Sequence, residues 1–127
     1  MQNVRNLAVW RIAIDVADAV YDLSTRLPRD ERFGVTRQLR RAAVSVAANI
    51  AEGAGRSSDR DFRRFLLIAI GSLEEACTYV ELAYRRDWLD REAESAIRAL
   101  TDKLRAKLLQ LIKRIEKDIR SATKPEA

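Results

Sequence analysis

The sequence predicts an all-α protein, an antiparallel four-helix bundle with an up-down-up-down order of helices. Only 4 Gly and 2 Pro occur among the 127 residues, which leaves room for few turns. Strong helix formers such as Ala, Leu, Arg and Glu are abundant. Apolar residues recur at spacings of three and four along long segments, as they do on the buried face of a helix. Short connections between such segments favour antiparallel neighbours.

The length and composition indicate one soluble globular domain. A chain of 127 residues with 47% hydrophobic and 34% charged residues suits a single core, which we place in residues 1–120. The segment SATKPEA, residues 121–127, is expected to be a disordered tail. Uncharged runs such as residues 65–73 are too short to cross a bilayer. Since the first residues also lack the apolar core of a secretion signal, we expect a cytoplasmic protein without a membrane partner.

The first two predicted helices span residues 6–27 and 36–54. The first ends at Leu27 because a residue that precedes proline avoids the helical region. A loop with the sequence PRDERFG follows it. The second helix is expected to end at Gly53 or Gly55, either of which can adopt the left-handed conformation of a helix cap.

The third predicted helix spans residues 58–86, with Ser58 as the N-cap and Asp61 in the place of the usual capping-box Glu. Its main apolar face suits the core of the bundle. A second apolar group lies on the opposite side, and a monomeric bundle would leave it in water. Exposed apolar groups of this kind are typical of interfaces, so we expect subunit contacts at Leu67, Ile68, Gly71, Tyr79 and Leu82.

The fourth predicted helix begins after Asp90, which serves as its N-cap, and ends at Ile119 or Arg120. Its apolar positions recur every three or four residues and form a narrow arc. The other three helices have wide apolar surfaces. We therefore expect the fourth helix to lie outermost in the bundle.

The second helix has a narrow polar stripe flanked by small residues. At 100° per residue, its members fall within an arc of about 80°; they are Gln38, Arg41, Ser45, Asn49 and Glu52. The stripe has three interpretations: a solvent-facing surface, a ligand site, or a buried polar network. In the network, which we favour, Arg41 would pair with Glu52 or Asn49 across turns or between subunits. Such networks often fix register or assembly.

The residue types exclude several kinds of active site. The chain has no histidine, which removes Ser-His-Asp triads, Cys-His pairs and histidine metal sites. No compact acidic cluster points inward, so we expect no metal ion and no cofactor. The turn from Gly53 to Ser58 precedes a helix and could hold phosphate, although a capped turn explains it better. Cys77 is expected to pack in the core. The chain is therefore predicted not to be an enzyme.

Basic residues gather on the fourth helix. From Asp102 to Arg120 there are seven basic and three acidic side chains, a balance of +4 in a chain whose net charge is +5. Such a surface can contact nucleic-acid phosphates. An ordinary solvated outer face is the competing interpretation. The candidate contacts are Lys103, Lys107, Lys113, Arg114 and Lys117, of which all but Lys113 share one side of the helix.

Several motifs resemble those of the small four-helix-bundle family found in the intervening sequences of 23S rRNA. The order and spacing of these motifs are specific, and they cover the chain from Leu7 to about Leu89. The family usually has Pro where Ala47 stands, and often Leu or Ile at Val35 and Val46. The matching motifs are LAVW at 7–10, LP at 27–28, ERFG at 31–34, QLRRA at 38–42, SVAANIAEG at 45–53, GR at 55–56, FRRFL at 62–66 and AIGSLEE at 69–75.

The resemblance implies an antiparallel four-helix bundle that assembles into a homopentamer and is not an enzyme. Related accessory proteins of diversity-generating retroelements bind nucleic acid and a reverse transcriptase through a basic surface. The residues that match the family signature have no established catalytic role. They are Gln38, Arg41, Ser45, Asn49, Glu52 and Arg56.

Two functional hypotheses follow from the sequence. The first is a non-catalytic homo-oligomer that binds RNA or DNA through a basic outer surface, as an accessory to a nucleic-acid enzyme. The alternative is a structural or adaptor assembly that docks a protein partner without binding nucleic acid. A catalytic role is the weakest option. A measured turnover that is lost when Glu52 is changed to Gln would be needed to support it.

Overall fold

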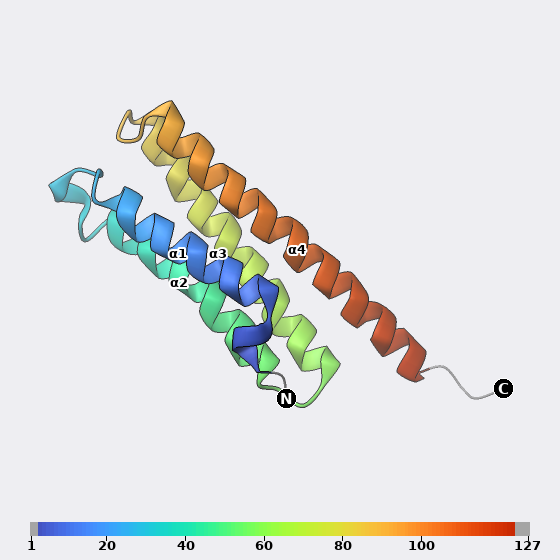
Figure 1. Cartoon of the computed structure of the whole chain (residues 1–127). Coiled ribbons are helices and arrows are strands. Elements are labelled where there is room, and N and C mark those ends of the chain that lie inside the picture. The colour runs from blue at the N-terminus through green and yellow to red at the C-terminus, as the bar shows by residue number, and fades with distance from the viewer. Residues whose placement is uncertain (1–2, 124–127) are drawn as a thin grey trace.

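The computed structural model describes residues 3–123, and these form an all-helical bundle (Figure 1). The four α-helices are α1 (Ala8–Ser24), α2 (Val35–Ala54), α3 (Asp59–Arg85) and α4 (Arg91–Thr123). Two short 3-10 turns, η1 (Val4–Asn6) and η2 (Arg29–Glu31), precede α1 and α2. No strand occurs in the described part of the chain. The predicted fold class is confirmed.

Consecutive helices run in opposite directions and pack side by side (Figure 1). The helix α4 also contacts α1, which closes the bundle, whereas α1 and α3 lie diagonally opposite, as do α2 and α4. The most extensive contact joins α2 to α3. The core between the helices is aliphatic, and its largest fully buried side chains are Leu39, Ile50, Leu66, Leu73, Leu104, Leu108, Val16, Val20 and Val46.

The first helix is shorter than predicted at both ends. Leu7 is extended, with φ −82° and ψ 120°, so the chain enters α1 only at Ala8. At the other end, the backbone N–H of Leu27 donates to the carbonyl of Ser24 in a tight turn. Such i to i+3 hydrogen bonds commonly finish an α-helix. Pro28 itself has φ −56° and ψ 144°, outside the helical region, which agrees with the predicted stop.

The prediction of a left-handed glycine at the end of α2 was wrong. Gly55 caps the helix with φ −82°, and no described glycine has a positive φ. Among the described residues, a positive φ occurs instead at Asp87, with a value of 62°, in the turn between α3 and α4. Gly53 lies inside α2, where it allows close packing: a β-carbon there would lie 2.8 Å from the Phe65 β-carbon.

Both predicted N-caps are confirmed. The Ser58 hydroxyl accepts a hydrogen bond from the backbone N–H of Asp61 at 3.1 Å, and the Asp90 carboxylate accepts one from Ala93 at 2.8 Å. The cap of α2 comes from the preceding loop, since Glu31 accepts a bond from the N–H of Val35 at 3.3 Å. Each side chain satisfies a backbone donor that the helix leaves without an internal partner.

The last helix is longer than predicted. It continues to Thr123, three residues beyond the predicted end at Arg120, and so includes residues 121–123 of the expected tail. Residues 124–127 of the predicted tail lie outside the described residues. The first turns of α4 lie beside the last turns of α3 (Figure 1). The last turns of α4 therefore lie at the opposite end of the bundle, together with the start of α1 and the α2–α3 turn.

Candidate functional site

The basic row on α4 consists of Lys103, Lys107, Arg114 and Lys117. All four side chains are exposed. At 100° per residue they fall within an arc of about 80°, and at 1.5 Å per residue they extend over about 21 Å. Lys113, the fifth predicted contact, is also exposed but points toward the α3 side of α4. The structure therefore places the row on one continuous outer surface.

The row is not neutralised by acidic neighbours. Every ion pair within residues 3–123 uses an arginine, and none involves a lysine or Arg114. Two of the three acidic residues nearby are engaged elsewhere: Glu116 pairs with Arg63, and Asp102 pairs with Arg105. The third, Asp118, forms no ion pair with a described residue of the row. The positive charges of the row are thus available to an anionic partner.

The polar stripe of α2 lies along its groove with α3. The hydroxyls of Ser45 and Ser72 are 2.9 Å apart, and the Asn49 amide donates to Ser45 Oγ at 3.0 Å. Arg41 donates to Gln38 at 2.9 Å and forms an ion pair with Glu75 of α3. The Ser45–Ser72 and Arg41–Glu75 contacts connect α2 to α3, the two helices with the most extensive contact.

For contacts inside one subunit, two details of the predicted network were wrong. Arg41 pairs with Glu75 rather than with Glu52 or Asn49, and its side chain is 52% exposed rather than buried. Glu52 pairs with Arg56 four residues later, at 2.5 Å. Exposed pairs of this kind contribute little to stability. The stripe is therefore a half-exposed bridge between α2 and α3.

The outward face of α3 is apolar and uncovered by the rest of the chain. Leu67, Ile68 and Leu82 are 41–43% exposed, and a β-carbon at Gly71 would meet no atom within 4 Å. Tyr79, the fifth predicted interface residue, is half-buried, and its hydroxyl donates to Glu75 at 3.1 Å. The predicted interface group thus contains four outward residues and one that packs partly against the bundle.

A second apolar surface lies across α1 and α2. Ile14 and Tyr21 are seven residues apart, two helical turns, and therefore face the same way. Both are exposed, as is Val44 of α2, at 41–45%. Ile14 and Tyr21 lie on the wide apolar side of α1, whose charged residues share one stripe, so the sequence alone does not distinguish them from core residues.

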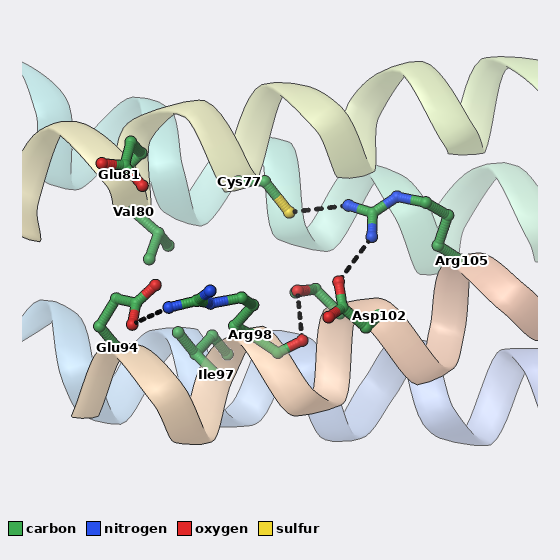
Figure 2. A pocket seen from close by; sticks show the side chains of 9 residues that line it. Cys77, Val80, Glu81, Glu94, Ile97, Arg98, Asp102 and Arg105 are labelled. Atoms are coloured by element: carbon green, nitrogen blue, oxygen red, sulfur yellow. Dashed lines mark hydrogen bonds and ion pairs between the residues drawn. The ribbon is translucent and has the colours of Figure 1, made fainter. Parts of the chain in front are cut away.

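A cleft of about 220 Å³ opens between α3 and α4 (Figure 2). Glu94 at one end is buried, with a side chain only 7% exposed, and it accepts a hydrogen bond from Arg98 at 2.6 Å. This hydrogen bond and the negative charge of Glu94 raise the pKa of Arg98 above its ordinary value. The charged groups at this end of the cleft therefore compensate each other.

Arg105 spans the other end of the cleft (Figure 2). Its guanidinium donates to Glu74 at 2.6 Å, to Asp102 at 2.8 Å and to the Cys77 sulfur at 3.4 Å. Partial burial lowers the pKa of Arg105, but the bonds to Glu74 and Asp102 outweigh this effect and leave the pKa raised. Because its pKa is raised, the Arg105 guanidinium keeps its positive charge throughout the neutral range and far into alkali.

Sequence reasoning missed the burial of Glu94. An acidic residue in the first turn of a helix is ordinarily a solvated partner of the helix dipole. The signal that could have revealed it is spacing, since Glu94 precedes Ile97 by three residues and Thr101 by seven, and both of these are buried. In residues 3–123, no group of three or more acidic or Cys side chains is arranged to hold a metal ion.

The family model of the 23S rRNA-intervening sequence proteins matches residues 5–110. The chain belongs to this family. The match includes the α2 stripe, the outward face of α3, and Lys103 and Lys107. The turns of α4 that carry Lys113, Arg114 and Lys117 lie beyond it.

A solved structure supports the assignment to the 23S rRNA-intervening sequence protein family. It is a protein with unknown function from the S23 ribosomal protein family of Bacteroides thetaiotaomicron, with 26% sequence identity and a TM-score of 0.77. The alignment covers 84% of this chain and 99% of that chain. A comparison with curated proteins found no match. No helix within residues 3–123 is long and apolar enough to cross a membrane.

Proposed function

We propose that this member of the 23S rRNA-intervening sequence protein family is a non-catalytic homo-oligomer that binds RNA or DNA through the basic row of α4. The observation that carries the proposal is the row itself: four exposed cations over about 21 Å of one helix side, none engaged in an ion pair among the described residues. A nucleic-acid backbone gains affinity from such a row by releasing its counterions. The family is named for rRNA intervening sequences, which agrees with an RNA partner.

Self-assembly would multiply the row. The two exposed apolar surfaces, one on α3 and one across α1 and α2, differ in composition and lie on different faces. When one face of a subunit contacts a different face of the next, the contacts are heterologous and can close into a ring. The proposed number of five subunits comes from the family resemblance. A ring repeats the basic row, so one long polyanion can contact several copies at once.

Binding of a short generic RNA across a salt series tests the nucleic-acid proposal. If the four cations of the row each neutralise one phosphate of a single strand, the slope of log K against log salt should approach about −3. Changing Lys103, Lys107, Arg114 and Lys117 to Glu should abolish binding. The matched control changes four exposed arginines at the other end of the bundle, Arg29, Arg37, Arg86 and Arg91, to Glu, and should retain most of it.

The outcome also separates the proposal from its alternative. Absence of RNA and DNA binding at low salt, or equal loss in the α4 variant and its control, would reject the nucleic-acid proposal. Specific capture of one protein partner after nuclease treatment would then favour an adaptor that docks a protein. The apolar surfaces of α3 and α1–α2 would be the docking candidates in that case.

Sedimentation tests the assembly independently of any ligand. One subunit has a mass of 14.5 kDa, so a pentamer has about five times that, about 72 kDa. We expect the pentamer at micromolar protein concentration. A monomer under these conditions would contradict the proposal even if the chain binds RNA.

A further inference from the structure

A second basic feature surrounds a cleft between the first turns of α3 and the last turns of α4. The cleft has a volume of about 350 Å³ and is lined by Arg60, Arg63, Glu116, Ile119 and Arg120. Three guanidinium groups and one carboxylate meet there, a net charge of +2. This arginine cleft lies on a different side of α4 from the basic row.

One of the three arginines is already held by the protein. Arg63 Nε donates to Glu116 Oε2 at 2.7 Å, and both side chains are more than half buried. The guanidinium groups of Arg60 and Arg120 make no ion pair and no hydrogen bond within the described residues. The pair fixes one guanidinium at the cleft and leaves the charges of the other two uncompensated.

The distribution of charge along the bundle favours the same end. The Ser45–Ser72 hydrogen bond and the Arg105–Glu74 pair divide the bundle at about half its length. The half formed by residues 3–15, 45–72 and 107–123 has eleven basic and six acidic side chains, a balance of +5. The other described residues, 16–44 and 73–106, have twelve of each. The whole net charge therefore lies on the half that contains the cleft.

We propose that the arginine cleft binds one phosphate group of the nucleic acid that the basic row attracts. The planar guanidinium can make two parallel hydrogen bonds to a phosphate, whereas a lysine ammonium acts as a point charge. Lys113 precedes Arg120 by seven residues and so lies on the same side of α4, between the row and the cleft. The inference rests on the proposed function and adds an oriented contact to an electrostatic one.

A gain of affinity gives the sharpest test. Glu116→Gln removes the carboxylate that competes for Arg63, so short single-stranded RNA should bind about two- to fivefold more tightly. Glu81→Gln is the matched control, because it removes one carboxylate and releases Arg85 at the opposite end of the bundle. A purely structural role for Glu116 would not strengthen binding.

The reverse change should weaken binding. Replacing Arg60 and Arg120 together by Gln should lower the affinity for the same RNA about three- to tenfold and reduce the salt slope by about 0.7 for the lost phosphate. The control pair, Arg37→Gln with Arg91→Gln, removes the same charge at the other end. Unchanged helical circular dichroism and sedimentation would show that each variant is folded and assembled.

The probes distinguish the source of the phosphate. Wild-type protein is compared on RNA with a 5′-phosphate and RNA with a 5′-hydroxyl. If the phosphorylated RNA binds more tightly and this difference disappears in the Arg60→Gln/Arg120→Gln variant, the cleft binds a terminal phosphate. If the variant loses the same affinity for 5′-phosphate RNA and for 5′-hydroxyl RNA, the cleft binds a backbone phosphodiester. Competition by inorganic phosphate shows that the free ion also enters the cleft. If wild-type protein binds RNA but the cleft variants behave like their controls, the inference fails alone. If wild-type protein binds no RNA, the proposed function fails with it.

Discussion

Two glycines, one at the end of α2 and one in the middle of α3, show how differently single positions are used in the fold. A β-carbon at Gly53 would lie 2.8 Å from the Phe65 β-carbon and 3.0 Å from a ring carbon of Phe62. A β-carbon at Gly71 would meet nothing within 4 Å. The first glycine therefore sets the approach of α2 to α3, whereas the second leaves open space on the outward face.

Gly53→Ala should destabilise the protein by about 1–3 kcal/mol, because the new methyl group overpacks the α2–α3 contact. Gly71→Ala is the matched control, and in the isolated subunit it should stabilise α3 by up to about 1 kcal/mol through helix propensity. Urea unfolding at one protein concentration measures both. A midpoint for Gly53→Ala at or above that of the wild type would contradict the packing argument.

At the same scale, the sequence indicated which side chains are polar but not which partners they find. Arg41 bonds to Gln38 and Asn49 bonds to Ser45, but Arg41 finds its ion-pair partner in Glu75 and not in the predicted Glu52 or Asn49. That partner depends on how far α2 and α3 slide along each other. The periodicity of a single helix contains no information about this offset, which the packing of the whole bundle determines.

Helix ends were predicted best where a side chain makes the cap. Ser58 and Asp90 were identified because their oxygens satisfy the first free N–H groups of α3 and α4. The start of α1 was missed because the extended backbone of Leu7 has no side-chain signature. The cap of α2 comes from Glu31 in the preceding loop, a contact that depends on the η2 turn.

Asp90→Ala should lower the free energy of unfolding by about 1 kcal/mol, since the N–H of Ala93 would lose its acceptor. Asp90→Asn keeps a capping oxygen and should recover most of the loss. Thermal unfolding followed by circular dichroism measures the difference. Equal stabilities of the Ala and Asn variants would indicate that the cap contributes nothing.

At the scale of the whole molecule, the fold class and the order of the helices were predictable because patterning and short connections leave few alternatives. The position of the basic row was predictable too, since it lies on one helix. The arginine cleft was not, because Arg63 and Glu116 are 53 residues apart and meet only through the α3–α4 packing. Sites built across helices require the assembled bundle.

Assembly should depend on the outward face of α3. Ile68→Glu with Leu82→Glu places two charges on that face, and burying them against a neighbour is unfavourable. We expect monomers with unchanged helical content. Leu109→Glu changes an equally exposed leucine of α4 and should leave the assembly intact. Sedimentation of an intact oligomer from the double variant would show that subunits meet elsewhere.

The same double variant should also bind RNA more weakly, because a monomer presents a single basic row. The loss should be larger for a long RNA than for one that spans a single row, since only a long RNA contacts several subunits. Equal losses for both lengths would indicate that each subunit binds independently.

The uneven use of the two basic residue types has a practical consequence. Arginines are spread along the chain, whereas all five lysines occur from residue 103 onward. An amine-directed acylating reagent would therefore convert lysine side chains only in the last quarter of the chain and leave every guanidinium intact. Acetylation, chemical or enzymatic, would thus neutralise three of the four cations of the basic row and leave Arg114 and the arginine ion pairs between helices unchanged. Bound nucleic acid should protect those amines from the reagent.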